Sequence, residues 1–285
     1  MYPLLLSIGP INIYSYGLMI FIAFITCLHI AKKLAQKEGI SPKLYEDVAI
    51  WGLLVGLLGA KLLYILTRLD EVIHTPNSLL NYITSGFVFY GAPLAVIPFL
   101  YFIRKKYKFS VLKFLDIFMV VLPLGHAIGR IGCFLAGCCY GKPTTLPWGV
   151  TFKNSTIVEP ALRSVALHPV QLYESFLLCV LFIILYKLFK KKCFDGQVFC
   201  AYFMCYAVIR IITEQFRGDG IRGFIISNLI STSQFISLIM FIISLVSFFY
   251  FKRHFLYKNK HEEKYNRCSC FGCLDGYLSP SSIFI

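Results

Sequence analysis

Long runs of hydrophobic residues, separated by short polar segments, are the dominant pattern along this 285-residue chain. Each run comes near the roughly 20 residues that a helix needs to cross the hydrocarbon core of a bilayer. The runs cover residues 13–31, 48–66, 87–102, 114–135, 172–189, 198–213 and 230–251. The pattern therefore predicts an all-α, polytopic integral membrane protein with seven transmembrane helices.

Composition supports a membrane protein over a soluble one. Hydrophobic residues make up 58% of the chain, charged residues make up 15%, and the mean hydropathy is +0.70. Soluble domains carry roughly 25% charged residues. We expect residues 1–256 to form a single membrane-embedded domain, and residues 257–285 to form a basic, cysteine-containing cytoplasmic tail.

The basic residues are divided unequally between the two sides of the predicted bundle. The chain has a formal charge of +14. Nineteen lysines and arginines fall in loops on one side, and six fall in the opposite loops. The larger group occupies segments 32–43, 104–113, 187–192 and 252–267. By the positive-inside rule, the N-terminus lies outside and the C-terminus inside. The basic excess is then a feature of topology, and we expect no nucleic-acid partner.

One predicted span carries an arginine among glycines. Arg130 lies near the end of the fourth apolar run, and Gly129, Gly132, Gly137 and Gly141 are spaced around it. An arginine at membrane depth is costly, so it faces a cavity or an anionic partner. Its planar guanidinium can grip a phosphate through two parallel hydrogen bonds. The glycines allow a neighbouring helix or a ligand to approach the backbone closely. The segment predicts a phosphate-binding site within the bilayer.

The sixth predicted span ends in a polar face. Tyr206, Arg210 and Glu214 are spaced four residues apart and so stack on one side of a helix, with Arg217 expected one further turn along. Inside a membrane such a face must look into the bundle or a polar cavity. The alternative is an Arg210–Glu214 ion pair that only fixes helix packing.

Other polar groups occur at the predicted outer ends of spans. His168, Gln171, Tyr173 and Glu174 lie where the chain re-enters the membrane, and spanning does not require them. Tyr16 lies at the outer end of the first span, where an aromatic ring either anchors the helix at the interface or contributes to a site.

Small residues mark a predicted helix-packing face. Gly52, Gly56 and Gly59 lie on the second span, next to Lys61, and Tyr90 lies near the start of the third. Small residues at this spacing let two membrane helices approach closely. We therefore expect the second span to pack tightly against a neighbour.

The cysteines allow several interpretations. Cys133, Cys138 and Cys139 either form a disulfide, with Cys133 as one partner, or pack and line a substrate channel. In the tail, Cys268-x-Cys270-x-x-Cys273 lacks a nearby histidine, which makes it a weak metal site or a site of lipidation. We expect no metal site and no cofactor.

Together these segments resemble the prolipoprotein diacylglyceryl transferase family over nearly the whole chain. The similarity rests on motifs in matching order: Ser7-Ile-Gly-Pro10 with Tyr16-Gly17, Gly129-Arg130-Ile-Gly132 through Gly141-Lys142-Pro143-Thr144, His168-Pro-Val-Gln171-Leu-Tyr173-Glu174, and Tyr206-x3-Arg210-x3-Glu214. Members of this family move a diacylglyceryl group from phosphatidylglycerol to the lipobox cysteine thiol of a preprolipoprotein and release glycerol phosphate. The resemblance implies phosphatidylglycerol and preprolipoprotein signal peptides as partners, and the bacterial plasma (inner) membrane as the location.

The resemblance also implies roles for individual residues. The catalytic group comprises Arg130, Arg210, Glu214, Tyr206 and His126, where the two arginines stabilise the charge of the departing phosphate. Phosphatidylglycerol is expected to contact Arg130, Tyr16, Gly141 and Arg210. Supporting positions are His168, Gln171, Tyr173 and Tyr90.

The chain departs from the family pattern at the positions that would handle the thiol proton. The family usually has histidine where this chain has Tyr90, and asparagine and glutamate where it has Cys133 and Cys138. The sequence therefore does not identify the residue that acts as general base. His126, one helical turn before Arg130, is either this base or a packing residue.

Two other functions are compatible with the sequence. The same lipid site would serve a transferase with a different acceptor, because the variant residues surround the incoming nucleophile. A non-enzymatic lipid transporter would be expected to show broken helices related by an internal repeat, and none is visible in the sequence.

Overall fold

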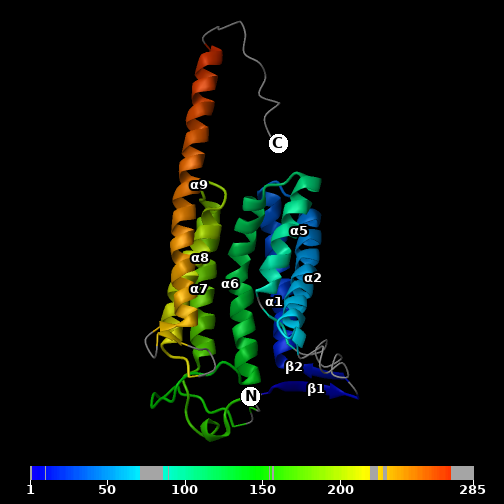
Figure 1. Cartoon of the computed structure of the whole chain (residues 1–285), viewed down its shortest axis with the longest axis vertical. Coiled ribbons are helices and arrows are strands. Elements are labelled where there is room, and N and C mark those ends of the chain that lie inside the picture. The colour runs from blue at the N-terminus through cyan, green and yellow to red at the C-terminus, as the bar shows by residue number, and fades with distance from the viewer. Residues whose placement is uncertain are drawn as a thin grey trace.

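The chain forms a bundle of long helices with a compact cap at one end (Figure 1). A computed structural model describes residues 2–9, 11–70, 86–88, 90–153, 155, 157–218, 224–226 and 230–270. Within these ranges there are seven α-helices, a short 3-10 helix and two two-stranded hairpins. The predicted all-α architecture is confirmed.

A hairpin that the hydrophobic pattern did not predict precedes the first helix. Strands β1 (Leu4–Ile8) and β2 (Ile11–Tyr14) pair antiparallel, and α1 (Ser15–Lys37) follows directly. The backbone N–H and the hydroxyl of Ser15 both donate to the carbonyl of Pro3, at 3.0 and 3.3 Å. This contact satisfies a donor that the first turn of a helix leaves without a partner. The helix therefore begins two residues later than the predicted span.

The second and third long helices approach each other closely through glycine. Helix α2 (Pro42–Leu66) packs against α5 (Gly91–Tyr107). A Cβ atom at Gly59 would collide with the Gly91 carbonyl, and one at Gly56 would touch the Val96 side chain. The predicted small-residue packing face is confirmed. Helix α5 starts at Gly91, four residues after the predicted start.

Helix α6 (Val111–Ala136) stands at the centre of the bundle, between α1 and α7 (Figure 1). Its glycines face α1: a Cβ atom at Gly125 would meet the Cys27 sulfur, and one at Gly132 would meet Met19 and Tyr16. Gly137 then ends the helix in a left-handed conformation, with φ of 76°. These glycines therefore bring two helices together, as the sequence suggested.

The remaining helices pack in chain order on the other side of α6 (Figure 1). They are α7 (Val170–Lys190), α8 (Gln197–Glu214) and α9 (Thr232–Cys270), with strands β3 (Phe224–Ile226) and β4 (Ile230–Ser231) before α9. Helix α9 has 39 residues, roughly 58 Å at 1.5 Å per residue, so it projects beyond the bundle. It crosses the expected domain boundary at residue 256, and residues 271–285 of the expected tail lie outside the described residues.

Lys192, in the turn between α7 and α8, ties three elements together. The Lys192 ammonium lies 3.1 Å from Asp116, 3.2 Å from Glu38 and 3.3 Å from Asp195. Asp116 also accepts hydrogen bonds from the backbone at the start of α8. Burial alone would lower the pKa of Lys192, but the neighbouring carboxylates, Asp116 foremost, raise it above its ordinary value. The lysine therefore stays charged and holds α1, α6 and the α7–α8 turn in place.

The lower end is closed by the segment between α6 and α7. It contains a 3-10 helix (Pro160–Leu162) and isolated bridges that join Leu167 to Pro143 and Val150. Phe152, Val158 and Leu167 form a small buried core of their own. This segment therefore folds as loops with one short helical piece over the end of the bundle.

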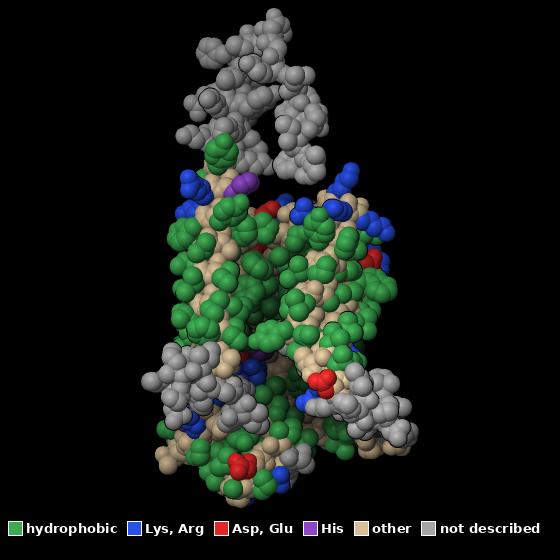
Figure 2. All heavy atoms as spheres, viewed as in Figure 1, with side chains coloured by type: hydrophobic (Ala, Val, Ile, Leu, Met, Phe, Trp, Pro, Cys, Tyr) green, Lys and Arg blue, Asp and Glu red, His purple; other side chains and the backbone are tan. Residues whose placement is uncertain are grey.

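Six of the described helices are long and apolar enough to span a membrane; α5, with 17 residues, is the one left out. In Figure 2, hydrophobic side chains cover the helices on both sides of the bundle, α7 to α9 on one side and α1 to α5 on the other. A hollow lies between the two sides. Lysines and arginines gather around the upper end of the bundle (Figure 2). A multi-span membrane protein is confirmed, whereas the seventh span and the orientation stay predictions.

Candidate functional site

The predicted arginine of α6 meets the start of α7. Arg130 Nη2 donates to Glu174 Oε1 at 2.9 Å, and the Glu174 side chain is 1% exposed. A carboxylate so deeply buried needs a cationic partner, because an isolated buried charge is strongly unfavourable. Glu174 therefore fixes the guanidinium plane of Arg130 at the lower end of the bundle.

His126 approaches the same carboxylate from one turn away on α6. Its Nε2 atom lies 3.6 Å from Glu174 Oε1, and its ring lies 5.6 Å from that of Tyr206, centroid to centroid. Tyr206 in turn stacks on Tyr202, with an interplanar angle of 5°. The predicted common face of His126 and Arg130 is confirmed, and this face looks towards α8.

Arg210 of α8 is held by two neighbours. Its Nη2 atom lies 2.8 Å from Glu214 Oε2, and it donates to the hydroxyl of Ser233 on α9 at 3.1 Å. The ion pair that the four-residue spacing predicted is therefore present. Arg217 does not continue this face, because α8 ends at Glu214 and Arg217 forms an antiparallel bridge with Gly141.

Both arginines retain a buried nitrogen that makes no hydrogen bond within the described part of the chain. These atoms are Arg130 Nε and Arg210 Nη1. The side chains are only 13% and 12% exposed. A buried N–H group without an acceptor is unfavourable, so such atoms indicate a ligand that supplies one. Two fixed guanidinium groups with spare donors suit an anion.

Two buried acceptor atoms near these arginines receive no hydrogen bond from the described residues. Glu174 Oε2 and Gln171 Oε1 are buried, and neither is hydrogen-bonded to any described residue. The amide nitrogen of Gln171 is already used, because it donates to the Cys138 carbonyl at 2.6 Å. The site therefore offers unused donors and unused acceptors together.

The cap places the other predicted residues beside this cluster. His168 Nδ1 and the Tyr173 hydroxyl are 3.2 Å apart, and the Trp148 ring nitrogen donates to the same hydroxyl at 2.8 Å. Phe216 packs against the rings of both His168 and Tyr173. His168 and Tyr173 therefore build the rim of the site, where α8 leads into the cap.

Gly141 has a clear packing role. A Cβ atom at this position would collide with the side chain and carbonyl of His168, and the Gly141 backbone N–H donates to the same carbonyl at 3.1 Å. A Cβ atom at Gly218 would likewise collide with the Gly141 carbonyl. Glycine at both positions therefore allows these three backbone segments to meet.

The two remaining predicted tyrosines lie at different distances from the arginines. Tyr16, at the start of α1, lies against α6, where a Cβ atom at Gly132, two residues after Arg130, would come within 3.3 Å of the Tyr16 ring. Tyr90 immediately precedes α5, and its side chain is 57% exposed. Because α5 packs on α2, Tyr90 belongs to that side of the bundle. Lys61 of α2 also lies there, 4.4 Å above the Phe87 ring.

An apolar cavity of about 650 Å³ opens between α1, α2, α5 and α6. Tyr16 lies among its lining residues, as do Tyr45 and Phe114 at the opposite ends of helices. Nearly all other lining residues are aliphatic or phenylalanine. The cavity therefore runs from the arginine-bearing end towards the lysine-rich end and suits a hydrocarbon chain.

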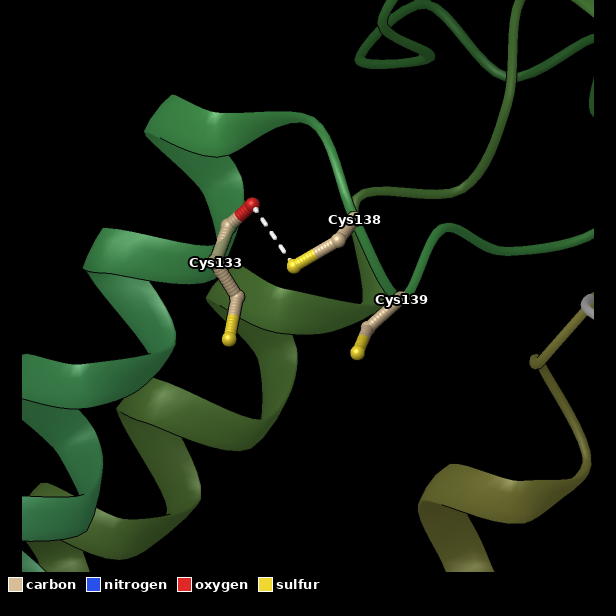
Figure 3. A group of neighbouring side chains, drawn as sticks. All are labelled: Cys133, Cys138 and Cys139. Atoms are coloured by element: carbon tan, nitrogen blue, oxygen red, sulfur yellow. Dashed lines mark hydrogen bonds between the residues drawn. The ribbon is translucent and has the colours of Figure 1, made fainter. Parts of the chain in front are cut away.

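Three thiols gather directly after Arg130. The Sγ atoms of Cys133, Cys138 and Cys139 all lie within 4.8 Å of one another, and the three cysteines are free (Figure 3). Hydrogen bonds with the Cys133 and Cys138 thiols, and the charges of Arg217 and Arg130, lower the pKa of Cys139. Hydrogen bonds with Cys133 and Cys139, together with burial, raise the pKa of Cys138. The three thiols therefore form one interacting group directly after Arg130.

Several residues of the site have a role that the sequence pattern did not indicate. Glu174 stands in the sequence as one of the polar residues between His168 and Glu174, but only the fold shows that it pairs with Arg130. Ser233, Trp148 and Phe216 carry no sequence signal, because their importance depends on which helix ends meet. Cys139 stands out in the sequence as one of a group, but its place beside the Arg130 and Arg217 charges follows from the fold.

Comparison with known proteins identifies the family of this chain. The family profile of prolipoprotein diacylglyceryl transferase matches residues 3–250. A phosphatidylglycerol–prolipoprotein diacylglyceryl transferase of Clostridium tetani is 40% identical over 250 residues, which cover 87% of this chain and 97% of the relative. Proteins of the same name from Finegoldia magna and Thermotoga maritima are 34% and 32% identical, over 81% and 85% of this chain and 90% and 82% of the relatives. The chain belongs to the prolipoprotein diacylglyceryl transferase family.

Proposed function

We propose that this chain transfers the diacylglyceryl group of phosphatidylglycerol to the lipobox cysteine thiol of preprolipoproteins. Transfer of this group is the activity of the family to which the chain belongs. The observation that carries the proposal is the pair of buried arginines, Arg130 and Arg210, each with an unused donor. A phosphodiester of a lipid supplies both the charge and the acceptor atoms that these donors lack.

In this reaction the two arginines act on the leaving group. The bond between the diacylglyceryl carbon and the phosphate oxygen breaks, and the electron pair stays on the phosphate of glycerol phosphate. Fixed cations that face this developing charge in a water-poor site lower the barrier. Glu174 and Glu214 hold the guanidinium groups in place, so little rearrangement is needed during the step.

The unused acceptors suit the alcohol part of the same lipid. Glu174 Oε2 and Gln171 Oε1 can accept hydrogen bonds from the glycerol hydroxyls of phosphatidylglycerol. A headgroup without hydrogen-bond donors, such as choline, would leave both oxygens buried and unsatisfied, which is unfavourable. This pairing favours phosphatidylglycerol over phosphatidylcholine.

The apolar cavity provides a place for the lipid tail. Tyr16 lines the cavity and lies against Gly132, two residues after Arg130, so it links the cavity to the arginine-bearing end. Binding pockets of about 300–1,000 Å³ are typical for ligands of this general size. We place an acyl chain between α1, α2, α5 and α6, with the headgroup at Arg130.

The acceptor thiol must lose its proton. A free thiol has a pKa near 8.5, so most of it is protonated at neutral pH. We propose that His126 accepts this proton. Its Nε2 atom lies 3.6 Å from Glu174 Oε1. The carboxylate stabilises the imidazolium that forms. Tyr206 packs on the same ring and fixes its orientation.

The unequal distribution of basic residues sets the orientation we propose. The lysine-rich upper end of Figure 2 faces the cytoplasm, and the cap with the arginine site faces the outside. All seven helices cross the bilayer, α5 included. Its 17 residues reach roughly 26 Å, near the thickness of a hydrocarbon core.

A reconstituted assay tests the function. The full chain is placed in vesicles that contain phosphatidylglycerol and is given a lipobox peptide, and the product is identified by mass spectrometry. We expect a thioether adduct of diacylglyceryl mass on the cysteine peptide and none on its serine counterpart. Vesicles with phosphatidylcholine alone should give no product.

Two outcomes would contradict the proposal. Release of glycerol phosphate without modification of the peptide would indicate a different acceptor. Movement of lipid between leaflets without any covalent product would indicate a transporter.

A further inference from the structure

The backbone at the C-terminal end of α6 brings the three thiols beside Arg130 close together. Cys133 lies in the last turn of α6, while Cys138 and Cys139 follow the left-handed Gly137. The Cys138 thiol points back across this turn and contacts the Cys133 carbonyl at 3.6 Å (Figure 3). The helix end therefore folds back on itself and brings all three sulfur atoms to one point.

Cys139 adopts a conformation that a non-glycine residue usually avoids. Its φ angle is 60°, one of two positive values among the described non-glycine residues. Left-handed backbone is unfavourable for a residue with a Cβ atom and occurs mainly where surrounding structure enforces it. Here the enforced turn directs the Cys139 sulfur towards the other two (Figure 3).

The distances fit a metal–thiolate centre. All three sulfur atoms lie within 4.8 Å of one another. Three thiolates at about 2.3 Å from a tetrahedral zinc ion lie roughly 3.8 Å apart. Side-chain shifts of less than about 1 Å therefore bring the three ligands to binding distance.

The surroundings suit an anionic group of ligands. Arg130 lies one turn before Cys133 on α6, and the backbone of Arg217 bridges Gly141, two residues after Cys139. Three thiolates on a divalent ion carry a net negative charge, which these arginines offset. Soft sulfur ligands select d10 cations such as Zn²⁺ and Cu⁺ over Mg²⁺ or Ca²⁺.

We propose that Cys133, Cys138 and Cys139 bind one Zn²⁺ ion, and that the thiol of the acceptor cysteine occupies its fourth coordination position. Three protein ligands and one open position characterise catalytic zinc sites, whereas structural sites use four protein ligands. The second half of this inference rests on the proposed function, because it takes the acceptor to be a cysteine.

The step balances without any further reagent. With zinc bound, the acceptor thiol would lose its proton on coordination, because a thiol bound to zinc is deprotonated. The proton would pass through water to His126, which lies two turns before Cys133 on α6. The sulfur then forms a bond to the diacylglyceryl carbon, and the carbon–oxygen bond to phosphate breaks. The electron pair leaves on glycerol phosphate, which Arg130 and Arg210 hold. The thioether product is neutral and binds zinc weakly, so it departs.

Metal content provides the first test and does not depend on activity. The full chain is purified under reducing conditions, and zinc per chain is measured by elemental mass spectrometry. Cd²⁺ is then titrated, and sulfur-to-cadmium charge transfer is followed in the ultraviolet. We expect one ion per chain in the wild type. Loss of an outer-shell partner lowers metal affinity by about 10- to 100-fold, and Cys139→Ser, which loses a ligand, should lose more.

The matched control is Cys193→Ser. Cys193 is an exposed cysteine in the α7–α8 turn, at the opposite end of the bundle. This variant should bind like the wild type, and circular dichroism should show equal helix content for both variants. A wild type that binds no Cd²⁺, or that carries a native Cys133–Cys138 or Cys133–Cys139 disulfide, would overturn the site.

A second measurement separates the zinc site from the proposed function. A cysteine lipobox peptide is added to the Cd²⁺-loaded chain, and the number of sulfur ligands is read by X-ray absorption. An increase from three to four, absent with a serine peptide, supports the open position. An unchanged value of three overturns it. Zinc bound at three cysteines in a chain that transfers no lipid would contradict the proposed function while leaving the metal site standing.

Discussion

At the scale of single residues, the site depends on which charged groups share a partner. Glu174 serves both Arg130 and His126, while Glu214 pairs with Arg210 on its own helix. A buried carboxylate between two basic groups orients both, and removal of any member leaves an uncompensated charge. The residue-level predictions therefore concern the geometry of these groups rather than charge alone.

Replacement of Arg130 by lysine should impair transfer even though the charge is kept. The ammonium group cannot reproduce the planar fork that reaches Glu174 and a phosphate together. A lost charge-assisted hydrogen bond costs about 1.5–3 kcal/mol, or roughly 10- to 150-fold in rate. The turnover of Arg130→Lys in the peptide assay measures this, with the exposed Arg253→Lys as control. Near-normal turnover of Arg130→Ala at equal abundance would remove Arg130 from the phosphate site.

Arg210 and Glu214 should behave as one unit. Arg210→Ala should abolish transfer, and Glu214→Gln should weaken it by releasing Arg210 from its 2.8 Å partner. A double-mutant cycle on the rates should give a coupling free energy within the range of about 0.5–3 kcal/mol seen for contacting residues. Additive effects would assign the two residues to separate roles.

His126 should set the acidic limit of activity. An imidazole accepts a proton only when neutral, so the transfer rate should fall as the pH drops and His126 becomes protonated. In a series of activity measurements against pH, His126→Gln should lower the rate and remove this acidic limb. His168→Gln should keep the limb, because His168 lies at the rim with Tyr173. Full activity with an unchanged limb in His126→Gln would make His126 a packing residue.

At the scale of helices, glycine decides how closely the spans approach. A Cβ atom at Gly59 of α2 would collide with the Gly91 carbonyl, whereas one at Gly52, two turns earlier, would meet only the Phe99 ring, at 3.8 Å. In a bilayer the hydrophobic effect does little to hold helices together, so close van der Waals packing carries more of the stability. The same helix therefore has one sensitive and one tolerant glycine.

Gly59→Ala should lower the thermal stability of the protein in detergent, while Gly52→Ala should leave it almost unchanged. Overpacking of a tight contact typically costs about 1–3 kcal/mol. The midpoint of thermal unfolding, followed by circular dichroism, compares the two variants directly. Equal midpoints would mean that α5 can move away from α2 without loss.

At the scale of the whole molecule, the lysine-rich end and the arginine site lie at opposite ends of the bundle (Figure 2). Helix α6 packs against α1, α7 and α8. An odd number of crossings would place the two chain ends on opposite sides of the membrane. The short helix α5 is the decisive element, because without it both ends of the chain would lie on the same side.

Reporter fusions should decide the orientation. Fusions after Tyr107 and after Lys192 should report a cytoplasmic location, and a fusion after Arg163 in the cap should report an external one. The reason is that 19 of the basic loop residues lie on the first side and six on the other. An external signal at Lys192 would exclude the seven-span arrangement.

The sequence by itself determined the apolar helices and the contacts within each of them. Hydrophobic run length located every long helix to within a few residues at its start or end, although it missed the β1–β2 hairpin, whose backbone partners lie across a turn. The Arg210–Glu214 pair followed from spacing, because the helical period places residues four apart side by side. The same reasoning failed for Arg217, which was expected on this face. The helical period does not indicate where a helix ends, and Arg217 lies beyond the end of α8.

Contacts between helices were decided only by the tertiary structure. The Arg130–Glu174 pair, the His126–Tyr206 contact and the position of the site next to the apolar cavity all join different helices. The three converging thiols needed the reversed turn at Gly137 and the left-handed backbone of Cys139. A sequence period fixes which residues share a face, but the rotation of each helix about its axis follows from packing against its neighbours. That rotation determines which faces meet, and hence which charges and thiols form the site.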